Sequence, residues 1–175
     1  MIVDGIGFST TSNAVDAEIY GAEFELQCLP IDNLFVDLGL GYFSAEYEDL
    51  VVDAVDYSSN EMTMSPELTF NGLIHCDIPM GDRGSLTLQA DFNYQDEVLF
   101  DALNNPLMRE GGYWLRNGRV SWTSADVQWE VAAFGRNVGD EEYMVYAFDL
   151  SFFGFNEEMI GTPRGYGLEF MYRPN

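Results

Sequence analysis

Hydrophobic and polar residues alternate along most of this chain with a period of two. The clearest stretch runs from residue 86 to 95, with apolar side chains at every second position: Leu86, Leu88, Ala90, Phe92 and Tyr94. Thr, Gln, Asp and Asn residues occupy the positions between them. Because successive side chains of a strand point to opposite faces, this pattern predicts a β-strand with one apolar and one polar face.

Six further segments carry the same alternation, and helical periodicity is almost absent. The predicted strands are residues 18–28, 34–43, 67–78, 86–95, 113–123, 127–136 and 165–173. Residues 2–9 are a candidate eighth strand. We therefore predict an all-β, antiparallel fold of about seven or eight strands.

The connections between these strands alternate between short and long. The short ones, at residues 30–33, 80–84 and 124–126, have the Pro, Asn, Asp, Gly and Ser composition of tight turns. The long ones are acidic and cover residues 48–65, 99–112 and 139–162. Long loops at one end and short turns at the other are typical of outer-membrane barrels. The pattern thus predicts an up-and-down transmembrane β-barrel.

The apolar face also suits contact with lipid. Aromatic residues lie toward the strand ends, where interfacial girdles occur: Tyr20, Tyr42, Tyr94, Trp114, Trp122 and Tyr172. The only charged residues expected on this face are Arg116 and Arg164, near strand ends from which an arginine can reach the interface. A soluble eight-stranded barrel that turns the same apolar face inward to bind an apolar ligand is the alternative.

Composition narrows the function. The 30 acidic and 7 basic residues give a net charge of −23, which argues against binding to nucleic acid. All seven basic residues are arginines and the only histidine is His75. The chain therefore has too few histidines for a typical histidine-based metal site, and only one that could serve in a catalytic triad. No nucleophile-elbow or dinucleotide-binding motif is present. We expect neither an enzyme nor a cofactor.

Three segments carry a resemblance to a known family. Residues 13–25 read NAVDAEIYGAEFE, residues 134–143 read FGRNVGDEEY and residues 161–170 read GTPRGYGLEF. In this order they resemble the N-x-x-x-A-x-x-x-G-x-E-x-E strand, the rNLfDk-Y segment and the G-x-PRtygl opening of the final barrel strand of TonB-dependent outer-membrane receptors. The resemblance covers essentially the whole chain.

This resemblance implies that residues 1–175 are one partial barrel domain, without a plug, from the C-terminal portion of a larger barrel; a small closed barrel is the other way to arrange the strands. It implies a place in the bacterial outer membrane and uptake of a scarce nutrient such as an iron-siderophore, cobalamin or an oligosaccharide. The implied partners are outer-membrane lipid, the rest of the barrel, the plug and, only through that plug, an energy-coupling protein.

Two arginines are candidate ligand-binding residues on the polar face. Arg119 and Arg136 have guanidinium groups that can pair with carboxylates of an anionic ligand or of the plug. The favoured alternative is structural pairing with Glu130 and neighbouring acids of adjacent strands.

A phenylalanine-rich stretch lies in the longest loop. Phe152, Phe153 and Phe155 are expected to line a ligand vestibule or to pack against neighbouring loops or lipid headgroups, and the sequence does not separate these alternatives.

Other reactive residues receive structural interpretations. Cys28 and Cys76 fall on the first and third predicted strands, too far apart for a disulfide, so we expect free thiols on the apolar face. His75 is expected to be a lone hydrogen-bonding residue. The acidic clusters at residues 46–56 and 140–142 contain oxygen ligands suited to Ca²⁺ but no EF-hand spacing, and solvated loop charge is the favoured interpretation.

Overall fold

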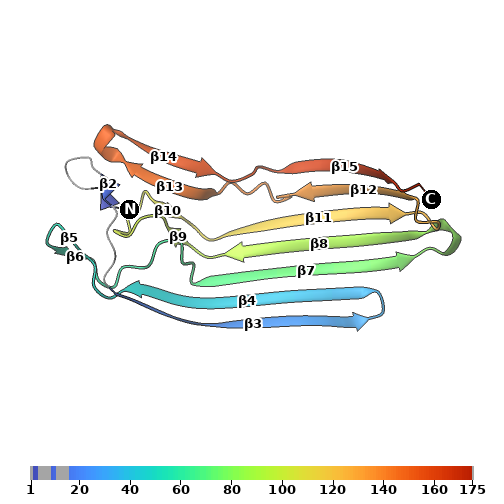
Figure 1. Cartoon of the computed structure of the whole chain (residues 1–175), viewed down its shortest axis with the longest axis horizontal. Helices are drawn as coiled ribbons and strands as arrows, with labels where there is room; N and C mark the ends of the chain where they lie inside the picture. The colour runs from blue at the N-terminus through green and yellow to red at the C-terminus, as the bar shows by residue number, and fades with distance from the viewer. Residues whose placement is uncertain (1, 4–8, 11–15, 175) are drawn as a thin grey trace.

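The computed structural model describes residues 2–3, 9–10 and 16–174. Its main element is an antiparallel sheet of seven strands in the order β15-β12-β11-β8-β7-β4-β3 (Figure 1). The strands are β3 (Ala17–Ile31), β4 (Leu34–Tyr47), β7 (Leu68–Pro79), β8 (Ser85–Gln95), β11 (Tyr113–Thr123), β12 (Trp129–Arg136) and β15 (Gly165–Tyr172). All seven predicted strands are confirmed, with ends that shift by a few residues.

The register of the sheet places the alternating apolar positions on one face. One row of directly paired residues runs across five strands through Ile74, Ala90, Gly118, Gly135 and Tyr166. The neighbouring rows follow the same parity, so each polar position pairs with a polar-face position of the next strand. Because a slip of one residue would move a whole strand's apolar set to the other face, this register confirms the two-faced sheet that the sequence predicts.

The sheet is open. β3 and β15 form its two edges, and no pairing joins them in the described part of the chain. Apolar side chains on the apolar face stay exposed, for example Leu168 at 68% and Phe170 at 74%. A soluble eight-stranded barrel and a small closed barrel would both bury one face inside a closed wall, so neither is formed. The sheet has the shape of a portion of a larger barrel wall.

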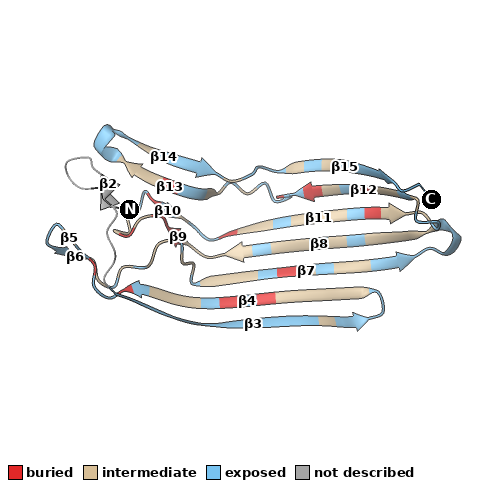
Figure 2. Ribbon diagram, viewed as in Figure 1, coloured by how far each residue is buried: buried red, intermediate tan, exposed pale blue. Residues whose placement is uncertain are grey.

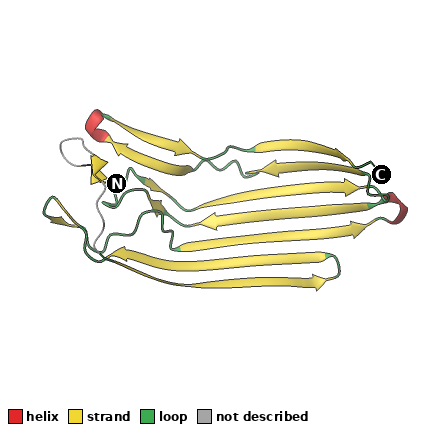
Figure 3. Cartoon of the chain, in the orientation of Figure 1, coloured by secondary structure: helices red, strands yellow, loops and turns green. Residues whose placement is uncertain are grey.

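The two ends of the sheet differ as predicted. One end carries the short turns: residues 32–33, the 3₁₀ turn η1 (Gly81–Arg83) and residues 124–128. Asn33 adopts a positive φ of 67°, which asparagine tolerates in a tight turn. The three long connections gather at the opposite end (Figure 1). Outside the sheet, regular structure consists of short strands and two 3₁₀ turns (Figure 3).

The longest connection is not the open loop that the sequence predicts. Within residues 139–162, β13 (Met144–Leu150) and β14 (Phe155–Ile160) form an antiparallel hairpin, with the 3₁₀ turn η2 (Ser151–Phe153) at its tip. The apolar residues of β13 do not alternate with polar ones, because neighbouring loops cover part of both faces. A period-two search therefore misses this strand.

Residues 2–9 do not add an eighth strand to the sheet. β1 (Ile2–Val3) pairs with β2 (Ser9–Thr10) in a separate two-stranded ladder, and residues 4–8 lie outside the described residues. Two further short ladders form in the long connections. They pair β5 (Val51–Val52) with β6 (Val55–Asp56) and β9 (Val98–Leu99) with β10 (Arg109–Glu110).

Most buried apolar residues lie in or beside the long connections. The strands of the sheet carry mainly intermediate and exposed residues, with a few buried ones (Figure 2). Met108 is fully buried, in a cluster with Val98, Phe100 and Ala147. No helix in the described residues is long and apolar enough to cross a membrane. The buried clusters of the described residues therefore lie at the loop end of the sheet.

Candidate ligand-binding vestibule

The first and second long connections are joined by backbone and side-chain contacts. The Asn60 side-chain amide donates to the Ala102 carbonyl at 3.0 Å, and the Met64 amide donates to the Leu99 carbonyl at 2.9 Å. Ala102 also completes a small buried cluster with Tyr47 and Leu50. These links hold two loops that are more than 30 residues apart in sequence as one packed layer.

The third connection is anchored on the second. The Asn105 side-chain amide donates to an Asp149 carboxylate oxygen at 2.9 Å, and the Met144 backbone amide donates to the Glu110 carboxylate at 2.7 Å. These hydrogen bonds fix the base of the β13–β14 hairpin against the second connection.

A crevice of about 210 Å³ opens between these connections at the end of the sheet. Its lining is Met64, Pro66, Gln95, Val98, Phe100, Tyr113, Met144 and Val145. Gln95 and Tyr113 occupy polar-face positions at the ends of β8 and β11 and pair directly with each other. Apolar walls with a few polar groups are the usual composition of a small-molecule site.

Asn137 joins β12 to the base of the hairpin. It is 5% exposed, and its side chain makes three hydrogen bonds: its amide donates to the Glu141 carbonyl at 2.8 Å and the Thr162 carbonyl at 3.2 Å, and its oxygen accepts from the Glu141 amide at 2.9 Å. Its own backbone amide donates to the Asn117 side chain at 2.9 Å. With a φ of 46°, it turns the chain out of β12. The sequence pointed to this segment through the 134–143 resemblance but not to this role.

An aromatic contact stabilises the same junction. The rings of Tyr113 and Tyr143 are stacked with centroids 4.6 Å apart. Gly161 lies against the Tyr143 ring and donates its amide to the Tyr143 carbonyl at 2.8 Å. A side chain at residue 161 would collide with the ring, so this glycine is required by a close approach.

Arg119 is held in an ion-pair network on the polar face. Its guanidinium donates to the Glu169 carboxylate at 2.6 Å and to the Glu130 carboxylate at 3.3 Å. Glu130 also accepts from Arg173 at 2.8 Å. This is the structural cross-strand pairing that the sequence analysis favoured.

Arg136 differs from Arg119. Its guanidinium carbon lies 5.4 Å from the centre of the Phe134 ring, a cation–π contact within its own strand. Within the described residues it forms no ion pair, so the expected pairing with Glu130 is wrong for this arginine. Its charge remains available on the polar face.

Phe152, Phe153 and Phe155 lie at the tip of the β13–β14 hairpin and are 56%, 61% and 55% exposed. Phe152 and Phe153 meet edge to face with ring centroids 5.3 Å apart. Within the described residues, these three rings therefore make little contact with the other connections. The structure places them at the far end of the hairpin from β12 and β15, so they do not form one cluster with Arg119 and Arg136 (Figure 1).

Two acids of the long connections have pKa values that are shifted in opposite directions. Hydrogen bonds from Ser151 and Asn105 hold the pKa of Asp149 below its ordinary value of 3.8. Burial, together with the nearby carboxylates of Glu97 and Glu67, raises the pKa of Glu61 above its ordinary value. In the part of the chain that the structure describes, no three His, Cys, Asp or Glu residues are grouped as a metal site.

The expectations for the two cysteines and for His75 are confirmed. Cys28 and Cys76 are free thiols at apolar-face positions of β3 and β7. His75 makes a single side-chain contact, with the Asp77 carboxylate at 3.1 Å, and Asp77 also accepts from Thr87 at 2.6 Å. They are structural groups at the short-turn end.

A comparison with protein families decides the identity of this wall. Residues 2–138 match the family of the TonB-dependent receptor-like β-barrel. The chain belongs to this TonB-dependent receptor family. Its members are receptors and transporters of the outer membrane of Gram-negative bacteria, and they are not enzymes.

Solved structures of TonB-dependent receptors share the fold. The ferric yersiniabactin uptake receptor FyuA from Yersinia pestis matches with a TM-score of 0.76 and 16% identity, over 89% of this chain and 23% of the receptor. The ferric preacinetobactin receptor BauA from Acinetobacter baumannii matches with a TM-score of 0.72 and 18% identity, over 89% and 22%. The siderophore receptor PiuA from the same organism matches with a TM-score of 0.70 and 16% identity, over 89% of this chain and 22% of the receptor. The chain thus spans less than a quarter of each receptor.

Proposed function

We propose that this chain forms the C-terminal barrel wall and part of the extracellular vestibule of a receptor that takes up a ferric siderophore. The observation that carries the proposal is the shared fold with FyuA, BauA and PiuA, whose names describe siderophore receptors. The packed loop base and its exposed aromatic tip provide a surface that suits a partly apolar iron chelate. Cobalamin and an oligosaccharide are the competing nutrients.

In this function the chain supplies wall and contacts, and movement occurs elsewhere. The plug and the energy-coupling protein that acts through it would be provided outside these 175 residues. Of the two polar-face arginines, we propose Arg136 as the contact for an anionic group of the ligand or plug. Arg119 is committed to Glu169 and Glu130.

Phe152, Phe153 and Phe155 are our proposed ligand contacts. We expect joint substitution of all three by alanine to raise the Kd of the intact receptor for a ferric siderophore by at least about tenfold, since each aromatic contact contributes about 0.5–1.5 kcal/mol and about 1.4 kcal/mol is tenfold in affinity. Quenching of intrinsic fluorescence during titration measures the affinity. The matched control is Val51→Ala with Val55→Ala, two exposed apolar residues of the β5–β6 ladder at the same end of the sheet.

The same titration with cobalamin and with oligosaccharides tests the nutrient class. Binding of a ferric siderophore by the intact receptor, with cobalamin and oligosaccharides inactive, supports the proposal. Saturable binding of cobalamin or of an oligosaccharide, with no response to a panel of ferric siderophores, would overturn it.

A further inference from the structure

One face of the β13–β14 hairpin carries a single carboxylate among apolar side chains. Glu157 pairs directly with Phe148 across the hairpin, and Phe155 pairs with Leu150. Because alternate residues of a strand point to the same side, Phe155, Glu157 and Met159 share one face of β14. All three are exposed. In the described residues Glu157 has no ion-pair partner.

The opposite face of the hairpin has a different environment. Ala147 is buried in the cluster of Met108, and its direct partner across the hairpin is Glu158. Asp149, on the same face, accepts a hydrogen bond from Asn105 at 2.9 Å. This face is therefore attached to the second connection, and the exposed carboxylate among apolar side chains lies on the other one.

An aromatic ring beside a carboxylate attracts one kind of group, an ammonium cation. The face of a phenyl ring is electron-rich, and the carboxylate adds a full negative charge and a charge-assisted hydrogen bond. Positions two residues apart on a strand are separated by about 7 Å, so an ammonium group between Phe155 and Glu157 can contact both. An apolar arm attached to that cation would lie over Leu150 or Met159.

The surrounding connections favour the same sign of charge. The three long connections of the chain contain 13 acidic residues and one arginine. That arginine, Arg109, pairs with Glu97, and Arg164, just after the third connection, pairs with Asp140 at 2.9 Å. Burial and neighbouring carboxylates raise the pKa of Glu61. A negative field of this kind raises the local concentration of cations and repels anions.

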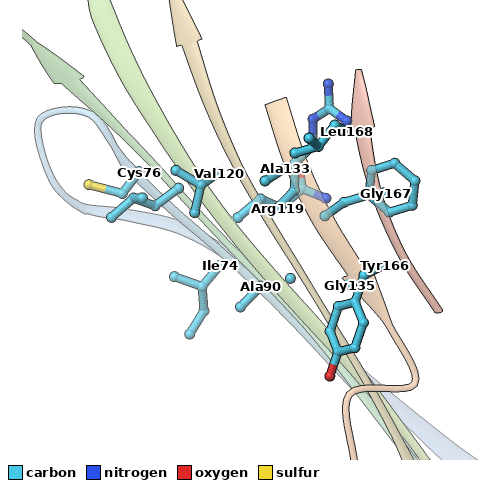
Figure 4. Close-up of a pocket in the computed structure, with 14 residues that line it drawn as sticks. Ile74, Cys76, Ala90, Arg119, Val120, Ala133, Gly135, Tyr166, Gly167 and Leu168 are labelled. Carbon is cyan, nitrogen blue, oxygen red and sulfur yellow. The ribbon is translucent and has the colours of Figure 1, made fainter. Parts of the chain in front are cut away.

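A recess on the apolar face of the sheet does not offer these groups. It has a volume of about 910 Å³, and Ala90, Gly135 and Tyr166 are among the residues that line it (Figure 4). Its lining, all within the described strands, includes Arg119 but no carboxylate. The hairpin face is therefore the better site for a cation.

We propose that the hairpin face of Phe155 and Glu157 binds the ammonium group of a cationic ferric chelate. The inference rests on the proposed function and names the chelate: a ferric trihydroxamate with a free ammonium group on an apolar arm. Three hydroxamates, with one negative charge each, balance Fe³⁺, so the ammonium group sets a net positive charge. Three catecholates, with two negative charges each, leave the chelate strongly anionic, and the acidic connections repel it. The anionic group that Arg136 contacts then belongs to the plug.

Three ferric chelates built on one scaffold test the charge of the arm. The probes are ferrioxamine B, its N-acetyl derivative and its N-succinyl derivative, in which the same arm ends in an ammonium, a neutral amide or a carboxylate. Quenching of the intrinsic fluorescence of the intact receptor in detergent measures the affinity. We expect the ammonium form to bind at least about tenfold tighter than the acetyl form, and the succinyl form to bind more weakly still.

Two variants separate the contact from the general field. Glu157→Gln and Glu158→Gln remove the same charge from neighbouring positions on opposite faces of β14. We expect Glu157→Gln to remove most of the difference between the ammonium and acetyl forms, and Glu158→Gln to keep it within about twofold, since only the first is a direct contact. Phe155→Leu keeps an apolar side chain and should weaken binding of the ammonium form alone by about threefold.

The possible failures are distinguishable. No response to any ferric chelate, tris-catecholates included, would overturn the proposed function and this inference with it. Equal affinity for the three probes, or binding of a ferric tris-catecholate alone, would overturn the inference and leave a siderophore receptor. Equal loss of the ammonium preference in Glu157→Gln and Glu158→Gln would assign the preference to the general field and overturn the hairpin site.

Discussion

The two faces of the seven-stranded sheet belong to the same strands but differ in the charged side chains that they carry. The polar face is cross-linked by charged side chains, as in the network of Arg119 with Glu130 and Glu169. Between the levels of Trp114 and Trp122, the apolar face of the described strands has a single charged side chain, Arg116, whose guanidinium carbon lies 5.5 Å from the centre of the Trp114 ring. This is the division of side chains expected of a transmembrane barrel with a polar lumen and an apolar outer surface.

The largest expected effect comes from moving one charge across the sheet. Ile74→Arg puts a guanidinium on the apolar face and should destabilise the barrel in a bilayer by about 2–4 kcal/mol. Leu73→Arg, one residue earlier, falls on the polar face between its cross-strand partners Asp37 and Asp91 and should change stability by less than about 1 kcal/mol. Urea unfolding of the intact receptor in lipid vesicles measures both, and equal losses would contradict a lipid-facing apolar surface.

The next largest loss of stability is expected at the end of β12, where the chain leaves the sheet. Asn137→Ala removes three side-chain hydrogen bonds from a buried position with a positive φ and should cost about 2–3 kcal/mol. Asn137→Gly keeps the backbone freedom and loses only the hydrogen bonds, so it should cost less. Hydrogen exchange of the β13–β14 amides in the intact receptor provides the measurement. Unchanged protection in both variants would mean that the hairpin is held by its other contacts.

A smaller effect is expected from the polar-face network. Arg119→Gln leaves Glu130 and Glu169 without one cation and should destabilise the sheet by about 1 kcal/mol, because these side chains are partly exposed and water screens the pairs. Added salt should reduce the difference from the wild type. Arg136→Gln, whose guanidinium has no carboxylate partner in residues 16–174, should change stability by less than about 0.5 kcal/mol. The two variants are compared by urea unfolding at low and high salt.

The smallest expected effect is a pH dependence of the β13–β14 hairpin, which lies in the loops and not in the sheet. The folded hairpin holds the pKa of Asp149 below 3.8, so it binds the ionised carboxylate more strongly than the unfolded segment does. This stabilisation is present at pH values above 3.8 and is lost as the pH falls through the lowered pKa. Cleavage of residues 144–160 by pepsin should therefore increase as the pH is lowered from 4 toward 2. Asp149→Asn should weaken this dependence, and an identical profile would contradict the assignment.

The sheet could be predicted from the sequence because each strand has one apolar and one polar face. That arrangement forces strict alternation, as in residues 86–95. The β13–β14 hairpin could not be found this way. Ala147, for instance, is buried against Met108 and its neighbours from another connection, so its environment depends on residues far away in sequence.

The candidate site was predictable only in part. Charge and residue type indicated that Arg119 would pair with Glu130, and the register brings them together as expected. Asn137 could not be recognised as a structural centre, because its partners, Thr162 among them, come from a segment 25 residues away. A recess on the apolar face was also hidden, since its small residues Ala90, Gly118 and Gly135 lie on three separate strands and come together only through the register.

The unequal lengths of the two edge strands have a mechanical consequence. β3 offers 15 residues to an adjoining strand, and β15 offers 8. A strand that pairs with β3 can therefore form a backbone hydrogen-bond ladder nearly twice as long as one that pairs with β15. Under pulling force or heating, the barrel should open first at the shorter ladder, the one formed by β15.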